Sequence, residues 1–112
     1  MPLLKIETNV NTGNSENLLK KLSHLTASLT GKPEKWVMVS ISYNPGMIFA
    51  GKTDPLIYAE LKSIGLPVDK TAEISARLME FLQKELLVPP NRMYVEYSDA
   101  RSNMWGWNKD TF

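Results

Sequence analysis

The amino-acid sequence predicts an α+β fold: two pseudo-repeated βαβ units forming one four-stranded mixed sheet, with two helices on one face. Two stretches carry apolar residues at helical spacing, and alternating stretches typical of strands flank each of them. The two halves also repeat weakly. When the first half is aligned with the second, Pro33 coincides with Pro89, and the same alignment superposes valines of two predicted strands. Because βαβ crossovers are right-handed, both helices are expected on the same face of the sheet.

The first half begins with a strand over residues 3–8, followed by a polar loop. Asn14 or Ser15 can cap the next helix, because both side chains accept hydrogen bonds from free N–H groups of the first turn. Gly31 suits the end of this helix, and Pro33 cannot continue it. The apolar stripe of the helix comprises Leu18, Leu19, Leu22, Leu25 and Leu29.

Alternating residues predict the next strands. Within residues 36–43, the odd-numbered residues form an apolar face of the predicted strand and the even-numbered residues form the opposite face. Residues 44–46 (Asn-Pro-Gly) are typical of a turn. Residues 47–50 are expected to return as a short strand. Residues 56–63 alternate again and predict a further strand of the sheet.

The second helix is expected to begin at Asp69, whose carboxylate is a suitable N-cap. Residues 88–90 (Val-Pro-Pro) stop it, and residues 92–98 predict the last strand of the sheet. The tail, residues 105–112, is aromatic and is expected to add a short strand. The apolar stripe of the second helix comprises Ile74, Leu78, Phe81, Leu82 and Leu86.

Length and composition exclude several classes of function. The chain has 112 residues, so we expect a single domain over residues 1–112. A net charge of +1 without a basic block does not favour nucleic acid or an anionic membrane as a partner. The absence of cysteine and the single His24 exclude thiol chemistry and a multi-histidine metal site, so no metal or cofactor is expected. We expect a cytoplasmic protein, with secretion without a signal peptide as the alternative.

The predicted fold leaves one face of the sheet without helices. Trp36, Met38 and Tyr94 are expected on that face, together with Leu3. Apolar and aromatic side chains gathered on one face need cover. Another copy of the same chain is the simplest cover, so the sequence predicts an oligomer.

The N-terminal dipeptide Met1-Pro2 is a candidate catalytic feature. Cells usually remove an initiator Met that precedes a small residue, and removal leaves Pro2 with a free secondary amine. Burial of that amine lowers its pKa, and a general base works best when its pKa is near the operating pH. The structural alternative is an ordinary N-terminus that frays.

Read end to end, the chain resembles the macrophage migration inhibitory factor family of the tautomerase superfamily. The resemblance implies a trimer of βαββαβ subunits with sites at the subunit interfaces. It also implies keto–enol tautomerisation of phenylpyruvate-like 2-keto acids, with the N-terminal proline as base and no cofactor. The segments that carry it are Met1-Pro2, Glu7-Thr8-Asn9-Val10, Leu29-Thr30-Gly31-Lys32-Pro33, Lys62-Ser63-Ile64-Gly65, Pro90-Asn91-Arg92-Met93-Tyr94-Val95, Gly106-Trp107-Asn108 and Thr111-Phe112.

The resemblance also implies a role for each matching residue. Pro2 matches the catalytic base, and Lys32 matches a lysine that binds the substrate carboxylate. Ile64 matches a residue whose backbone amide contacts that carboxylate, and Tyr94 matches a tyrosine supplied by a neighbouring subunit. The structural alternatives are a lysine that suits the helix dipole and a tyrosine that packs at an interface. The residues that match apolar or aromatic walls of the pocket are Trp36, Trp107 and Phe112.

Some positions depart from the cytokine branch of the family. Leu56 and Ala59 replace its Cys-x-x-Cys pair, so no thiol oxidoreductase activity is expected. Glu96 stands in place of an asparagine; a carboxylate facing the site would repel an acidic substrate and favour the protonated Pro2 amine. Trp105 replaces a small aliphatic residue and is expected to narrow the pocket, and Lys62 replaces a histidine near the rim.

Two other functions compete with a tautomerase. The first is a cytokine-like or other binding protein with a weak or vestigial pocket and an unidentified receptor. The second is another chemistry of the superfamily, such as dehalogenation or decarboxylation. That chemistry needs additional arginines in the site, for which Arg92 and Arg101 are the candidates, and no motif supports them.

Overall fold

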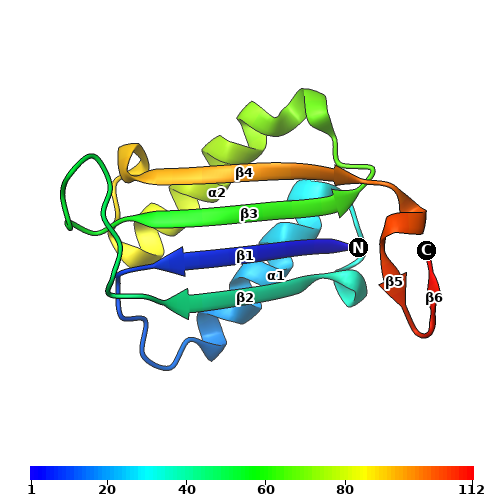
Figure 1. Cartoon of the computed structure of the whole chain (residues 1–112), viewed down its shortest axis with the longest axis horizontal. Helices are drawn as coiled ribbons and strands as arrows, with labels where there is room; N and C mark the ends of the chain where they lie inside the picture. The colour runs from blue at the N-terminus through cyan, green and yellow to red at the C-terminus, as the bar shows by residue number, and fades with distance from the viewer.

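Four strands form one mixed sheet in the computed structural model, which describes residues 1–112 (Figure 1). The strands lie in the order β2-β1-β3-β4. β1 pairs in parallel with β2, β3 pairs in parallel with β4, and the two central strands β1 and β3 are antiparallel. The predicted pair of βαβ units in one sheet is therefore confirmed. The strands are β1 (Pro2–Thr8), β2 (Met38–Tyr43), β3 (Ile57–Ile64) and β4 (Met93–Ala100).

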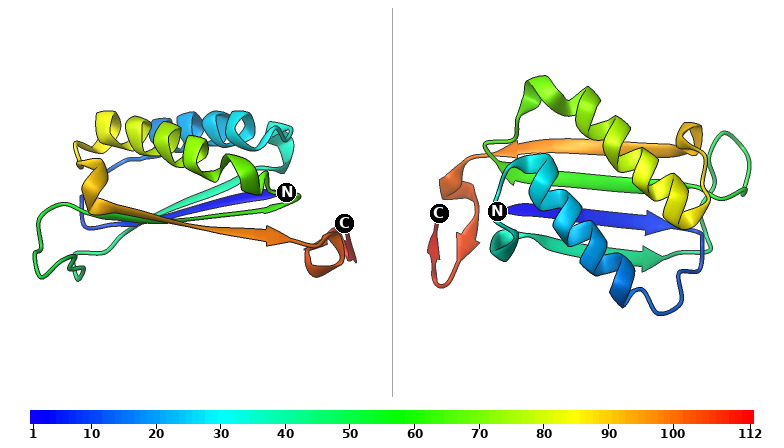
Figure 2. Two further views of the ribbon diagram at one scale, coloured as in Figure 1. Left: turned by 90° about the horizontal axis from the view of Figure 1, so that it is seen from above. Right: turned by 180° about the vertical axis from the view of Figure 1, so that it is seen from behind.

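Both helices, α1 (Glu16–Thr30) and α2 (Thr71–Leu86), lie on the same face of the sheet, as predicted (Figure 2). The Asn14 side chain accepts a hydrogen bond from an N–H of the first turn of α1 at 3.2 Å, and Gly31 ends α1 in the left-handed conformation. The two apolar stripes meet the inner face of the sheet. The hydrophobic core lies between the helices and the sheet. Its buried residues include Leu4, Ile6, Leu22, Ala59, Leu61, Ile74, Leu78 and Leu82.

The predicted cap of the second helix is wrong. A short 3-10 turn over Val68–Lys70 precedes α2, and the Asp69 side chain makes no capping hydrogen bond. The backbone N–H of Lys70 donates to the carbonyl of Pro67 at 2.9 Å, so the chain turns before the α-helix begins. Tertiary turn geometry therefore moves the start of α2 beyond the residue with the best capping side chain.

Two predicted strand segments also differ from the structure. Trp36 belongs to a 3-10 turn over Glu34–Trp36, held by its N–H donating to the carbonyl of Pro33, so β2 begins only at Met38. Residues 47–50 pair with no strand of the sheet. Phe49 and Lys52 instead exchange two backbone hydrogen bonds of 3.0 Å, which closes a tight turn.

The aromatic tail forms a separate hairpin beside the N-terminal end of β1 (Figure 1). Its strands are β5 (Gly106–Trp107) and β6 (Asp110–Thr111), so the predicted short strand is present and is paired within the tail. The two turn residues, Asn108 and Lys109, both have positive φ, which matches the right-handed twist of a two-residue hairpin.

The second face of the four-stranded sheet carries no helix (Figure 2). Met38 and Tyr94 are each 65% exposed on this open face, as the sequence predicts. Between them lies a group of charged side chains from β1 and β3. Neither helix is long and apolar enough to cross a membrane.

Candidate active site

Pro2 is the first residue of the central strand β1, and less than 2% of its surface is exposed. It lies opposite Ser63 of the antiparallel strand β3, which is also fully buried. β3 ends one residue later, at Ile64, where the chain turns through Gly65. The start of one central strand and the end of the other therefore form a single corner of the sheet.

Lys32 reaches this corner from the end of α1. Its ammonium nitrogen lies 3.7 Å from the point where a Cβ would sit on Gly65. Gly65 has φ 65°, in the left-handed region that favours glycine. A Cβ at 3.7 Å would make only an ordinary van der Waals contact with the ammonium, so the backbone conformation is what favours glycine here. The structure thus brings together three residues that the sequence points to: Pro2, Lys32 and Ile64.

The amine at this corner is held in surroundings that disfavour its charge. In this chain the free α-amine belongs to Met1, one residue before the Pro2 nitrogen, which is an amide. Partial burial lowers the pKa of the Met1 amine, and the positive charge of Lys32 lowers it further.

An aromatic cluster forms near this corner from two distant parts of the chain. The ring of Trp36 meets those of Trp107 and Phe112 edge to face, with centroids 4.8 and 5.4 Å apart. The N–H of Phe112 donates to the carbonyl of Trp105 at 3.1 Å, which ties the end of the tail back onto the hairpin. Trp107 remains 52% exposed, so the cluster offers an apolar surface to solvent.

Tyr94 and Glu96 lie away from this corner within the same chain. Tyr94 pairs with Tyr58 of β3, which pairs with Glu7 of β1, near the end opposite Pro2. From strand spacings of about 3.3 Å along and about 4.8 Å across the sheet, Tyr94 lies roughly 19 Å from Pro2 and Glu96 roughly 14 Å. Neither residue can therefore contact the Pro2 end of its own chain.

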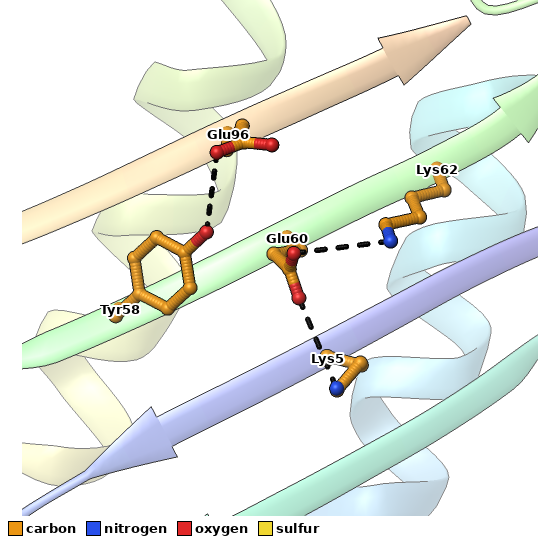
Figure 3. Close-up of polar contacts among 5 residues, drawn as sticks. All are labelled: Lys5, Tyr58, Glu60, Lys62 and Glu96. Carbon is orange, nitrogen blue, oxygen red and sulfur yellow. Dashed lines mark hydrogen bonds and ion pairs between the residues drawn. The ribbon is translucent and has the colours of Figure 1, made fainter.

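Glu96 belongs to a polar group on the open face (Figure 3). The Tyr58 hydroxyl donates to the Glu96 carboxylate at 3.3 Å, while Glu60 receives the ammonium groups of Lys5 at 3.9 Å and Lys62 at 3.8 Å. Partial burial raises the pKa of Tyr58, and the two nearby carboxylates raise it further. Lys62, expected near the rim of the site, is thus directed toward Glu60.

Sequence reasoning missed the role of Arg92. Its guanidinium donates hydrogen bonds to backbone carbonyls of the segment that follows β2, at the end of the sheet opposite Pro2. Such partners leave no pattern of side chains in the sequence. Since these donors are occupied, Arg92 does not supply the free cation that a dehalogenase or decarboxylase reading requires. Arg101 is exposed at the end of β4.

Comparisons with known proteins agree over the full length of the chain. The family model described as "Macrophage migration inhibitory factor (MIF)" matches residues 1–112. A macrophage migration inhibitory factor homolog of Brugia malayi is 36% identical, with 100% of this chain and 99% of that protein covered. A homolog of Trichuris trichiura is 37% identical, with 100% of both chains covered.

Solved structures show the same fold. The macrophage migration inhibitory factor of Trichinella spiralis superposes with a TM-score of 0.93 at 29% identity, over 98% of this chain and 99% of that one. A homologue from Prochlorococcus marinus gives a TM-score of 0.91 at 38% identity, over 98% of both chains. The chain therefore belongs to the macrophage migration inhibitory factor family, which is part of the tautomerase superfamily.

Proposed function

We propose that this chain is a keto–enol tautomerase of phenylpyruvate-like 2-keto acids, with the Pro2 amine as general base once Met1 is removed. The observation that carries the proposal is the corner of the sheet at which Pro2 is buried and the Lys32 ammonium lies against Gly65. A base and a fixed cation at one end of a strand suit a substrate with a carboxylate beside its reacting carbon.

The proposed reaction moves one proton. The neutral Pro2 amine removes a proton from the carbon next to the keto group, and the electron pair shifts to form the enolate. The resulting ammonium returns a proton to the enolate oxygen, so no other reactant is needed. Lys32 and the backbone at Ile64 hold the carboxylate, and the aromatic residues Trp36 and Phe112 help exclude water from the amine.

Tyr94 and Glu96 take part only if another subunit supplies them, because each lies well over 10 Å (roughly 14–19 Å) from Pro2 in one chain. Trimers are typical of this family. A ring in which the Tyr94 end of one subunit meets the Pro2 end of the next uses the same contact three times, as head-to-tail ring interfaces do. We therefore propose a homotrimer with three composite sites, whose pockets Trp105 and Trp107 help to shape.

Two measurements test the proposed function. A mass spectrum first establishes whether a preparation retains or lacks Met1, and an ultraviolet assay then follows the conversion of an arylpyruvate between its keto and enol forms. Processed protein is expected to catalyse the conversion and Met1-retaining protein is not, because an acylated nitrogen cannot accept the proton. Equal rates from both preparations would exclude Pro2 as the base.

A second candidate function is that of a cytokine-like binding protein. The names of the curated relatives, macrophage migration inhibitory factor and its homologs, favour it. The same assay separates the two functions, because a binding protein with a vestigial pocket is expected to show no rate above that of its Pro2→Ala variant.

A further inference from the structure

Side chains from outside the segment between β2 and β3 hold its backbone. The side chains of Thr8 and Asn9 bind only its last residues, from Thr53 to Leu56, whereas Arg92 also reaches Phe49 and Lys52. Arg92 lies just before β4, and its guanidinium donates four hydrogen bonds to backbone carbonyls across this segment. The accepting residues are Phe49 at 2.9 Å, Lys52 at 3.1 Å, Asp54 at 2.8 Å and Pro55 at 3.2 Å. No carboxylate lies within 4.0 Å of the guanidinium, so its donors serve the backbone alone.

The fixed segment contacts Tyr94 directly. The ring of Phe49 lies 4.8 Å from that of Tyr94, centroid to centroid, and the guanidinium carbon of Arg92 lies 5.2 Å from the Phe49 ring. The two rings border an apolar cavity of about 450 Å³ that Met47, Ile48 and Tyr58 also line. Tyr94 therefore packs against Phe49, whose backbone carbonyl is bound by Arg92, two residues before Tyr94 in the sequence.

This arrangement needs the geometry of an arginine. The planar guanidinium presents five N–H donors in a rigid fork, whereas a lysine ammonium is a point charge with three donors on a flexible stem. The turn that it closes is also strained, because Ala50 has φ 54° and a non-glycine residue pays for the left-handed region. A weaker clamp would let this turn relax and carry Phe49 away from Tyr94.

We propose that Arg92 is a positioning residue of the tautomerase site: by fixing the segment after β2, it holds Phe49 against Tyr94 and aims Tyr94 at the site of the neighbouring subunit. The inference rests on the proposed function, in which Tyr94 binds substrate across the subunit interface. Arg92 acts through Phe49 and Tyr94 and does not itself touch the substrate.

The test uses arylpyruvate kinetics of the assembled protein carrying Arg92→Lys, Phe49→Leu or Tyr94→Ala. Arg92→Lys and Phe49→Leu are expected to raise KM roughly tenfold with kcat little changed, because misplacing a binding group by about 1 Å can cost up to ~10²-fold. In the Tyr94→Ala background, Arg92→Lys is expected to cause no further rise. Arg77→Lys, on the helix face with one side-chain hydrogen bond to Ser28, is the matched control and should leave KM unchanged.

Each outcome gives a decision. A KM unchanged by Arg92→Lys, or raised equally in the Tyr94→Ala background, overturns the positioning role even if the melting temperature falls. If Arg92→Lys does not assemble by light scattering, Phe49→Leu decides in the same way. If Pro2→Ala keeps the wild-type rate, the proposed function fails and the inference fails with it; if only Pro2→Ala and Tyr94→Ala have effects, the inference alone fails.

Discussion

The two ends of the central sheet are built from different kinds of residue. At the Pro2 end the chain closes on itself: Pro2 is buried, Lys32 covers Gly65, and the tail hairpin adds aromatic rings. At the Tyr94 end the chain is open. Tyr94 and Ile48 are both 65% exposed beside an apolar cavity, and the backbone that supports them is held by Arg92.

The difference between the ends indicates how a site can be divided between subunits. In the proposed site, the Pro2 end supplies the base and the Lys32 cation, and its Trp107 is half exposed. The other end supplies the Tyr94 hydroxyl, which has no proposed reacting group near it in the same chain. In the proposed trimer, the Tyr94 end of one chain meets the Pro2 end of the next, and the two ends together form each site. The following predictions test this division, from the largest expected effect to the smallest.

The largest effect is expected from the base. Pro2→Ala should lower the rate by roughly 10²–10⁴-fold, which is the usual share of general acid–base catalysis. The loss should appear mainly in kcat, because the amine acts on the transition state and contributes little to substrate binding. Steady-state kinetics on protein shown by mass to lack Met1 measure it. A loss confined to KM would make Pro2 a binding residue instead.

Division of the site between chains predicts recovery of activity on mixing. When the Pro2→Ala and Tyr94→Ala chains are coexpressed in equal amounts, about a quarter of the composite sites should combine an intact Pro2 with an intact Tyr94. The mixed assembly should therefore regain about a quarter of the wild-type kcat/KM at low substrate. An activity equal to the mean of the two parent variants would place both residues in one chain. A monomer by light scattering at micromolar concentration would contradict the trimer altogether.

Lys32 is expected to matter for charged substrates. Lys32→Ala should weaken the binding of arylpyruvates by about 1.5–3 kcal/mol, since a hydrogen bond to a charged group has been lost, and should spare uncharged ketones. Lys84→Ala is the matched control, because Lys84 lies in the last turn of α2 and forms an exposed i,i+4 ion pair with Glu80. Equal losses for both substrate types would mean that Lys32 only stabilises the end of α1.

Much of the fold could be predicted because local patterns and burial agree. The stripes of α1 and α2 and the alternation of β3 follow directly from residue spacing. Asp69 does not cap α2, and residues 47–50 do not form a strand of the sheet. In both places the backbone groups form hydrogen bonds within a turn instead, a 3-10 turn in the first case and a tight turn in the second. In both places the hydrogen bonds of a turn overrode the propensity of the residue.

The candidate site was predictable only in part. The resemblance points to Pro2, Lys32 and Ile64, and the structure brings these together. The sequence resemblance could not show that Tyr94 lies near the opposite end of the same sheet. Strand register depends on pairings between residues far apart in the sequence. Arg92 was not predictable as a clamp, since its partners are backbone carbonyls.

The pH dependence of the rate should distinguish the charges at the two ends. Partial burial lowers the pKa of the Met1 amine, one residue before Pro2, and the Lys32 charge lowers it further. We expect the same surroundings to lower the pKa of a freed Pro2 amine, so that the neutral base persists to lower pH than an ordinary α-amine would. Removing the cation in Lys32→Ala should therefore raise the kinetic pKa and move the acidic limb of kcat/KM, on which the base becomes protonated, to higher pH. An unmoved limb would mean that burial alone sets this pKa.

The smallest effect, of opposite sign, is expected from Glu96. A carboxylate brought near the base by a neighbouring subunit favours the ammonium, so Glu96→Asn should lower the kinetic pKa and raise the rate on acidic substrates at neutral pH. The change should be smaller than that of Lys32→Ala, because the Tyr58 hydroxyl already holds the carboxylate at 3.3 Å on the open face. Tyr58→Phe removes that hydrogen bond and should enlarge the effect of Glu96→Asn. If both variants leave the pH–rate profile unchanged, the Glu96 charge does not reach the base.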